Sequence, residues 1–330
     1  MDLRLTAEQE QLVGAFAALL AKQATTERVR AAEPVGFDKA LWDQLLETGV
    51  VAMAVPEADG GWGASLVDLA LVAEQVGRFV APAPVIEAQV AGRLLARLGA
   101  HDLVARAVAG ERLVTLAVRP GARLVPAAAV ADDALVYDGE RVVLVSLEGA
   151  RTTVENLGSM PLADVITSTG VEIAAGDAAR EAYETALDEW LALTAAALVG
   201  LGGRALEIGV DYVRERKAFG VPIGSFQGIS HRLADSAAAL DGTRLLALES
   251  AWADAEDAGR FRELAALAFA LAAEAARDVT YRSLHFHGGY GFMMEYDVQL
   301  YYRRARGWAG VFGGADAGYR RAADCRYGVG

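Results

Sequence analysis

A long apolar stripe in the second half of the chain constrains the fold more than any other feature. Its members recur every third or fourth residue, the spacing that places side chains on one face of an α-helix. The stripe consists of Leu187, Leu191, Thr194, Leu198, Leu201, Ala205, Ile208 and Tyr212. A helix of this length buries such a face mainly by packing against other helices, so the pattern predicts a helical bundle around it.

Other segments of this half carry helical patterns as well, and short connections join them. The predicted helices cover 226–257, 260–286 and 294–309. Together with the striped helix they make four long segments, which favour an antiparallel four-helix bundle. We assign this bundle to residues 177–330.

The first 110 residues are also predicted to be mainly helical. Thr6 and Gln9 have the spacing of a capping box, so a helix is expected over 6–23. By the spacing of apolar residues, further helical patterns cover 41–49, 66–77 and 86–99. We assign these segments to an N-terminal helical domain, residues 1–110.

The middle of the chain has the pattern of β-structure. Asp138–Gly139 stands between the apolar runs of 134–145, which is a strong hairpin signal. Other strand candidates cover 113–118, 165–169 and 171–174. We therefore predict a small β domain at 111–176 and, for the whole chain, a mainly α fold with this β domain between two helical units.

Charge and composition exclude several functional classes. The net charge is −13 and the pI is about 4.9, whereas nucleic-acid binding needs a basic surface. Cys325 is the only cysteine, so the chain can form no internal disulfide or cysteine-based metal site. No apolar run approaches about 18 residues and the first residues lack the apolar core of a signal peptide, so we expect no membrane span and a cytoplasmic protein.

The segment Arg216–Gln227 combines side chains suited to a flat, phosphate-bearing cofactor. Arg216 provides a fork of donors for a diphosphate, Phe219 could pack against a ring, and Gln227 can donate or accept. The alternative is a cation favoured at a helix C-terminus, followed by an ordinary Gly-Pro turn.

A second candidate segment is rich in glycine. Gly288 and Gly289 lie between two helical patterns, where glycine lets backbone amides approach a phosphate closely. The alternative is a tight turn between helices. His285 and His287 lie nearby, but no further histidine accompanies them, so we expect no metal site.

Taken together, these motifs resemble the acyl-CoA dehydrogenase family. Arg216–Gln227, followed by His231–Asp235, is similar to that family's stretch of Arg, Phe-Gly, Pro-Ile, Phe-Gln and Ala-Asp. Gly288–Phe292 with Tyr302–Arg306 resembles its later glycine motif and the helix that follows. Val55–Arg78 resembles its N-terminal domain. The likeness spans most of the chain.

The resemblance implies FAD bound at a subunit interface and tetramers built from dimers. Carried over by position, Arg216, Phe219 and Gln227 would contact the adenosine-diphosphate end of FAD. The glycine segment would serve the FAD of the neighbouring subunit, and His285 stands where the family has a Gln before its double glycine. The implied reaction is α,β-dehydrogenation of an acyl-CoA, with electrons passed on to an electron-transfer acceptor protein.

The position that carries the family's catalytic carboxylate holds Phe312 in this chain, and phenylalanine cannot take a proton. Some family members place the base on the first bundle helix, where the corresponding residue is Trp190. Its neighbour Glu189 is the remaining candidate base, although one residue amounts to about 100° on a helix. The alternative for Glu189 is a solvated helix carboxylate. Arg304 is a further departure, because it stands at a usual Asp position.

Three functional hypotheses follow. In the first, the chain is the base-free subunit of a two-gene heteromer, such as a heterotetramer, that acts on a bulky acyl-CoA such as a steroid side-chain thioester. In the second, it is a self-sufficient homo-oligomeric dehydrogenase that uses Glu189. In the third, it is a structural subunit without flavin.

Overall fold

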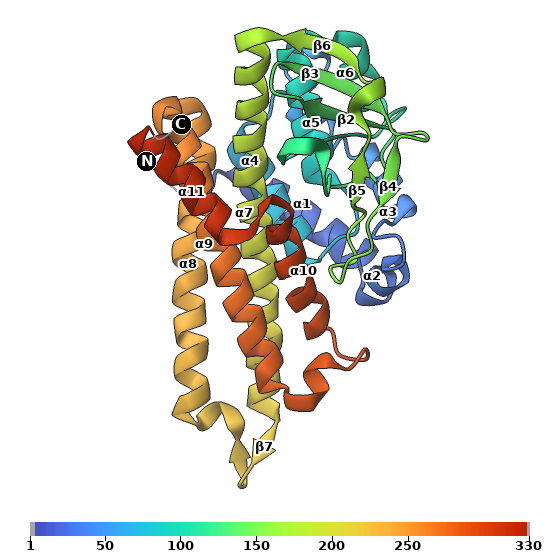
Figure 1. Ribbon diagram of the computed structural model, residues 1–330. Helices are drawn as coiled ribbons and strands as arrows, with labels where there is room; N and C mark the ends of the chain where they lie inside the picture. The colour runs from blue at the N-terminus through green and yellow to red at the C-terminus, as the bar shows by residue number, and fades with distance from the viewer. Residues whose placement is uncertain (1–3, 329–330) are drawn as a thin grey trace.

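The computed structural model describes residues 4–328 and has three structural regions (Figure 1). The N-terminal helices pack beside a long C-terminal bundle, and a small sheet lies next to the upper end of that bundle. This is the mainly helical architecture with a small β region that the sequence predicts.

The N-terminal region consists of α1 (Ala7–Gln23), α2 (Thr26–Ala32), α3 (Lys39–Glu47), α4 (Leu66–Arg78), α5 (Val85–Arg97) and α6 (His101–Val108). The predicted capping box is confirmed, because the Thr6 side chain accepts from the Gln9 amide and the Gln9 side chain accepts from the Thr6 amide. Sequence periodicity missed α2 and α6, which have only 7 and 8 residues and so offer about two turns of pattern. Short 3₁₀ turns are η1 (Ala52–Ala54), η2 (Glu57–Asp59), η3 (Pro120–Ala122), η4 (Thr167–Thr169) and η5 (Ile223–Ser225).

The β region contains a four-stranded sheet in the order β1-β2-β3-β6, with β1 parallel to β2 and the other pairs antiparallel. A separate antiparallel pair joins β4 to β5. The strands are β1 (Val114–Leu116), β2 (Asp133–Tyr137), β3 (Arg141–Ser146), β4 (Arg151–Thr153), β5 (Ala163–Val165) and β6 (Val171–Ala175).

The predicted hairpin is confirmed. The register of β2 and β3 runs from Asp133 opposite Ser146 to Tyr137 opposite Val142, with Asp138–Gly139 in the turn. The predicted strand over 165–169 is wrong beyond its first residue, because Val165 ends β5 and the polar residues Thr167–Thr169 form η4.

The bundle has three long helices, α7 (Gly176–Glu215), α8 (Gln227–Glu256) and α9 (Ala258–Phe286). A short hairpin of β7 (Lys217–Ala218) and β8 (Val221–Pro222) joins α7 to α8 at the lower end of the bundle, far from the sheet (Figure 1). After α9 follow the 3₁₀ turn η6 (Gly288–Phe292), α10 (Val298–Phe312) and α11 (Gly314–Tyr327).

The fourth helix of the bundle is therefore divided in two. The sequence predicts one helix over 294–309, whereas α10 begins at Val298 and runs to Phe312, and α11 was not predicted. Both helices pack on α9. Gly313 separates them with φ 115°, a left-handed conformation that glycine adopts without strain. The chain turns directly after Phe312 for this reason.

Helix α7 connects all three regions. Leu191, Leu198 and Leu201 of its stripe are fully buried, and burying each contributes about 1.5–3 kcal/mol. A side chain at Gly200 would lie 1.9 Å from the Glu74 carbonyl oxygen, so this glycine lets α4 and α7 approach closely. α7 is also the one helix among residues 4–328 that is long and apolar enough to cross a membrane, but 72% of its apolar window is buried within the protein.

Candidate functional site

The segment Arg216–Gln227 forms the lower tip of the bundle (Figure 1). The chain reverses at Phe219 and Gly220, which both have positive φ, and the Arg216 carbonyl accepts from the Ile223 amide across the hairpin. Phe219 is 96% exposed and meets Phe226 edge to face at 6.3 Å. The aromatic side chain predicted to pack against a ring therefore has one free face.

The cations of this tip are unpaired. The side chains of Arg214, Arg216 and Lys217 are exposed and form no hydrogen bond or ion pair with any residue from 4 to 328. Gln227, at the start of α8, is exposed and also without a side-chain partner in that range. Most arginines of this acidic protein instead pair with carboxylates. The tip is thus a local positive surface on a negatively charged molecule.

Packing brings the glycine segment to the same end of the bundle. The buried His287 ring stacks on Tyr212 of α7 at 3.9 Å, and its Nδ1 donates to the Ser283 carbonyl at 2.7 Å. Burial lowers the pKa of His287. Side chains at Gly288 and Gly289 would meet no atom within 4 Å, so their backbone is open. The exposed His285 stacks on Tyr281. The part of the chain that the structure describes holds no cluster of metal-binding side chains.

Large apolar side chains are exposed around this end of the bundle. They are Phe219, Val221, Phe226, Tyr281, Tyr290, Phe292, Met293 and Met294. Exposed large apolar side chains are common at subunit interfaces and ligand sites.

The two positions that the family resemblance gives for a base meet in one aromatic cluster. The ring of Trp190 lies 6.5 Å from the ring of Phe312, and both contact Phe269, at 6.1 and 5.5 Å. Trp190 and Phe269 are buried. Side chains that cannot take a proton therefore occupy both positions.

Glu189 points away from this cluster, toward α5. It is fully buried, which rules out the alternative of a solvated carboxylate. Arg93 Nε donates to it at 2.6 Å and Arg97 Nη1 at 2.8 Å. Burial by itself would raise the pKa of Glu189, but the two guanidinium groups outweigh that effect and lower it. A base tuned toward neutrality needs the opposite shift.

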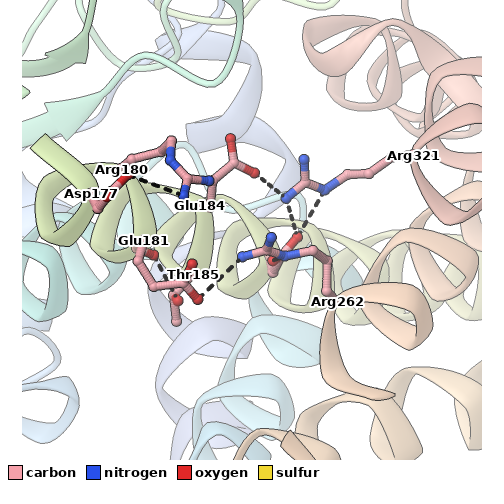
Figure 2. Close-up of polar contacts among 8 residues, drawn as sticks. Asp177, Arg180, Glu181, Glu184, Thr185, Arg262 and Arg321 are labelled. Atoms are coloured by element: carbon pink, nitrogen blue, oxygen red, sulfur yellow. Dashed lines mark hydrogen bonds and ion pairs between the residues drawn. The ribbon is translucent and has the colours of Figure 1, made fainter. Parts of the chain in front are cut away.

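Asp188, next to Glu189, belongs to a second ion-pair cluster. Arg321 donates to both Glu184 and Asp188, and Arg262 donates to Asp188. Figure 2 shows Arg321 beside Glu184, with Arg262 nearby. Burial raises the pKa of Asp188 to about 6, against the opposing effect of Arg321 and Arg262. Asp188 lines a groove of about 1440 Å³ between the β region, the first turns of α7, and the helices α9 and α11. Phe312 lines the same groove.

A smaller cavity of about 90 Å³ lies on the other side of the aromatic cluster, with Trp190 in its wall. The Trp190 Nε1–H donates to Glu87 Oε1 at 3.2 Å. Burial raises the pKa of Glu87, and its hydrogen bonds offset this only in part. The sequence analysis missed this carboxyl. Its only sequence signal is a Glu in the apolar first turn of α5, directly after Pro82-Ala-Pro84.

The residues of the tip fit the diphosphate half of a flavin dinucleotide. They offer unpaired guanidinium donors, an aromatic face and open glycine backbone. The aromatic cluster does not fit the role of a proton acceptor. The described residues thus offer a surface that fits a cofactor, and they place aromatic side chains at the two positions that the resemblance gives for a base.

Comparison with known sequences agrees with these features. A sequence model described as "Acyl-CoA dehydrogenase, N-terminal domain" matches residues 6–110, and one described as "Acyl-CoA dehydrogenase, C-terminal domain" matches residues 180–321. Acyl-CoA dehydrogenase IpdE2 of Mycolicibacterium smegmatis is 33% identical over 94% of this chain and 96% of its own length. Acyl-CoA dehydrogenase FadE27 of Mycobacterium tuberculosis is 30% identical over 97% of each chain.

Two solved structures have a fold similar to that of this chain. The Tcur3481-Tcur3483 steroid ACAD G363A variant superposes with a TM-score of 0.88 and 28% identity over 97% of each chain. The ChsE4-ChsE5 complex from Mycobacterium tuberculosis superposes with a TM-score of 0.86 and 27% identity over 99% of each chain.

Proposed function

The chain belongs to the acyl-CoA dehydrogenase family, and from this premise we propose that it is the base-free subunit of an FAD-dependent, hetero-oligomeric acyl-CoA dehydrogenase. The observation that carries the proposal is the contact between Trp190 and Phe312. An aromatic ring at both base positions leaves the α proton of a substrate without an acceptor from this chain. A homologous partner subunit then has to provide the carboxylate.

The tip of the bundle is this chain's contribution to the flavin site. Arg216 would hold the diphosphate, with Gln227 and the face of Phe219 beside the adenosine. Bound FAD supplies the hydride acceptor for α,β-dehydrogenation. The open backbone of Gly288 and Gly289 would approach the cofactor from the neighbouring subunit's side.

The names of the two structural neighbours support a heteromer. Each names a pair of proteins, and one of them is described as a steroid ACAD. The exposed apolar side chains around the tip are suited to an interface with such a partner. We propose a bulky acyl-CoA as the substrate and an electron-transfer protein as the electron acceptor.

The alternative hypotheses predict different behaviour. A self-sufficient enzyme would need Glu189 as its base, and the two bound guanidinium groups disfavour that role. A structural subunit without flavin would have no use for the unpaired Arg216.

Coexpression with the dehydrogenase encoded by a neighbouring gene tests the proposal. We expect a yellow heterotetramer that oxidises an acyl-CoA, whereas the chain alone is colourless or weakly yellow and inactive. Arg216→Ala should release flavin, measured by its absorbance near 450 nm, without preventing assembly.

Arg180→Ala is the matched control, because Arg180 lies in the first turns of α7, whose last residue directly precedes Arg216, and forms an exposed ion pair with Asp177. It should retain flavin. A colourless heteromer, or a tetramer that keeps its full flavin content after Arg216→Ala, would contradict the proposal. Turnover by the chain alone would contradict the need for a partner.

A further inference from the structure

The last turn of α7 connects the two segments that carry the candidate cofactor groups. At its end it continues into the tip, since Arg216 caps the helix and its amide donates to the Tyr212 carbonyl at 2.9 Å. At its side it meets the glycine segment, because the Tyr212 ring stacks on the ring of His287, the residue directly before Gly288. Tyr212 therefore contacts the tip through its backbone and the glycine segment through its side chain.

His287 is firmly held at this point. Its ring lies 3.9 Å from the Tyr212 ring with an interplanar angle of 21°, and it meets the Tyr296 ring edge to face at 5.9 Å. Its Nδ1 carries a proton, because the Ser283 carbonyl to which it is bonded can only accept. The residue is 4% exposed. These contacts fix the direction in which the chain leaves α9 toward the two open glycines.

Two other glycines seat both segments on the ends of the bundle helices. A side chain at Gly291 would lie 2.5 Å from the Leu284 carbonyl oxygen, so η6 packs directly on the last turn of α9. A side chain at Gly224 would lie 3.1 Å from Val213 Cγ2, so η5 packs directly on the last turn of α7. The stack of the tyrosine and histidine rings joins these two helix ends to each other.

We propose that His287 is a positioning residue of the flavin site, which holds the tip and the glycine segment in one relative arrangement by stacking on Tyr212. The inference rests on the proposed function, because it takes the ligand at this end of the bundle to be the diphosphate half of FAD. A diphosphate bound by a guanidinium and by backbone amides needs both groups at a fixed separation. Holding their backbones in place before the ligand arrives lowers the entropy that binding costs.

The imidazole performs this role as a neutral ring. Burial lowers the pKa of His287, and the hydrogen bond to the Ser283 carbonyl opposes that effect only in part. The titratable side chains in contact with the ring are Tyr212 of α7 and Tyr296 after η6, and from α9 it meets the Ser283 carbonyl. Because burial disfavours the charged form, the arrangement should weaken as the pH falls below the ordinary histidine value and through the lowered pKa.

The test uses the full-length protein purified with its partner subunit and compares His287→Phe with His287→Ala. Phenylalanine keeps a flat ring for Tyr212 and lacks the Nδ1 donor, whereas alanine removes the ring. FAD is stripped from each heteromer, and its rebinding is followed by flavin fluorescence. We expect His287→Ala to weaken FAD binding at least about tenfold and His287→Phe to weaken it less.

Val279→Ala is the matched control for a general loss of stability. Val279 is buried on the same helix, two turns before His287, and packs in a separate apolar cluster with Leu240 and Ala275. Its truncation should lower the melting temperature and leave FAD affinity unchanged. Equal loss of FAD affinity in Val279→Ala and His287→Ala would mean that stability alone is responsible, and would overturn the positioning role.

The pH dependence of FAD affinity gives a second readout. In the unchanged protein the affinity should fall as the pH drops below about 6, and His287→Phe should lack this fall because its ring gains no proton. An affinity that rises in acid only when His287 is present would mean that an imidazolium binds the diphosphate as a charge. That result would also overturn the positioning role.

Failure of this inference can be told apart from failure of the proposed function. Unchanged FAD affinity in His287→Ala, while Arg216→Ala still releases the flavin, would overturn the inference alone. A heteromer that binds no FAD even without substitutions would overturn both. If His287→Ala does not fold, the pH profiles of the unchanged protein and of His287→Phe still decide between a positioning ring and a charge.

Discussion

Glu189 allows the sharpest test of whether a carboxylate in this chain is structural or catalytic. Its carboxylate accepts from Arg93 and Arg97, so it ties α5 of the N-terminal region to α7 of the bundle. Glu189→Gln keeps the shape of the side chain and removes its charge. Two largely buried guanidinium groups then lose their counter-ion.

The expected loss of stability is large because the Glu189 carboxylate and the guanidinium groups of Arg93 and Arg97 are all shielded from water. Glu189 is 0% exposed, and the side chains of Arg93 and Arg97 are 16% and 28% exposed. Removing one partner of a buried ion pair destabilises a protein by about 3–5 kcal/mol. Arg93 also contacts Asp254 at 3.1 Å, and this second pair compensates in part. We therefore expect a loss of about 3 kcal/mol, the lower end of that range.

Glu207 provides a matched control on the same helix. It also binds two arginines, Arg78 and Arg204, at 2.8 and 2.9 Å, but its side chain is 42% exposed. Exposed ion pairs contribute about 0–1 kcal/mol, so Glu207→Gln should cost no more than that. Burial is the main difference between the two sites.

Urea denaturation of the two variants at neutral pH measures the difference. Because the two guanidinium groups hold the folded-state pKa of Glu189 below the ordinary value of a glutamate, its contribution to stability is present above that ordinary value and is lost as the pH falls through the lowered pKa. The difference in free energy of unfolding between the unchanged protein and Glu189→Gln should therefore become smaller only at acidic pH. Equal destabilisation by the two variants would refute the structural role. Loss of turnover at unchanged stability would instead establish Glu189 as the base.

The remaining predictions concern Glu87 and two glycines of α7. Because burial raises the folded-state pKa of Glu87, its contribution to stability is present at low pH and is lost as the pH rises. The melting temperature of Glu87→Gln should therefore rise relative to that of the unchanged protein between pH 4 and pH 8. A difference in melting temperature that stays constant over this range would contradict the raised pKa. Gly200→Ala should destabilise by at least about 1–3 kcal/mol, since the new methyl group would lie 1.9 Å from the Glu74 carbonyl oxygen. The new methyl group of Gly203→Ala would meet no atom within 4 Å, so this variant should stabilise the helix by about 0.5–1 kcal/mol. Chemical denaturation measures the free energy of unfolding of both glycine variants. Equal effects of the two substitutions would count against the close approach of α4 and α7.

Much of the fold could be predicted from the sequence, because the features concerned depend on nearby residues. The capping box at Thr6, the hairpin at Asp138–Gly139 and the striped helix α7 each follow from patterns within a few positions. Where the local pattern was short or interrupted, as in α2, α6 and the break at Gly313, the prediction failed. The motifs at the bundle tip were also found in the sequence, because the chain reverses there within a few residues.

The sequence by itself determined the family, the helical framework and the absence of a carboxylate at Phe312. Only the tertiary structure decided what the neighbouring side chains do. Glu189 is a buried ion-pair partner because α5, about ninety positions earlier in the chain, brings Arg93 and Arg97 to it. Arg304 and Thr194 face one cavity because α7 and α10 pack together. Charge, burial and pairing depend on residues distant in the chain, and no local spacing encodes which of them will meet.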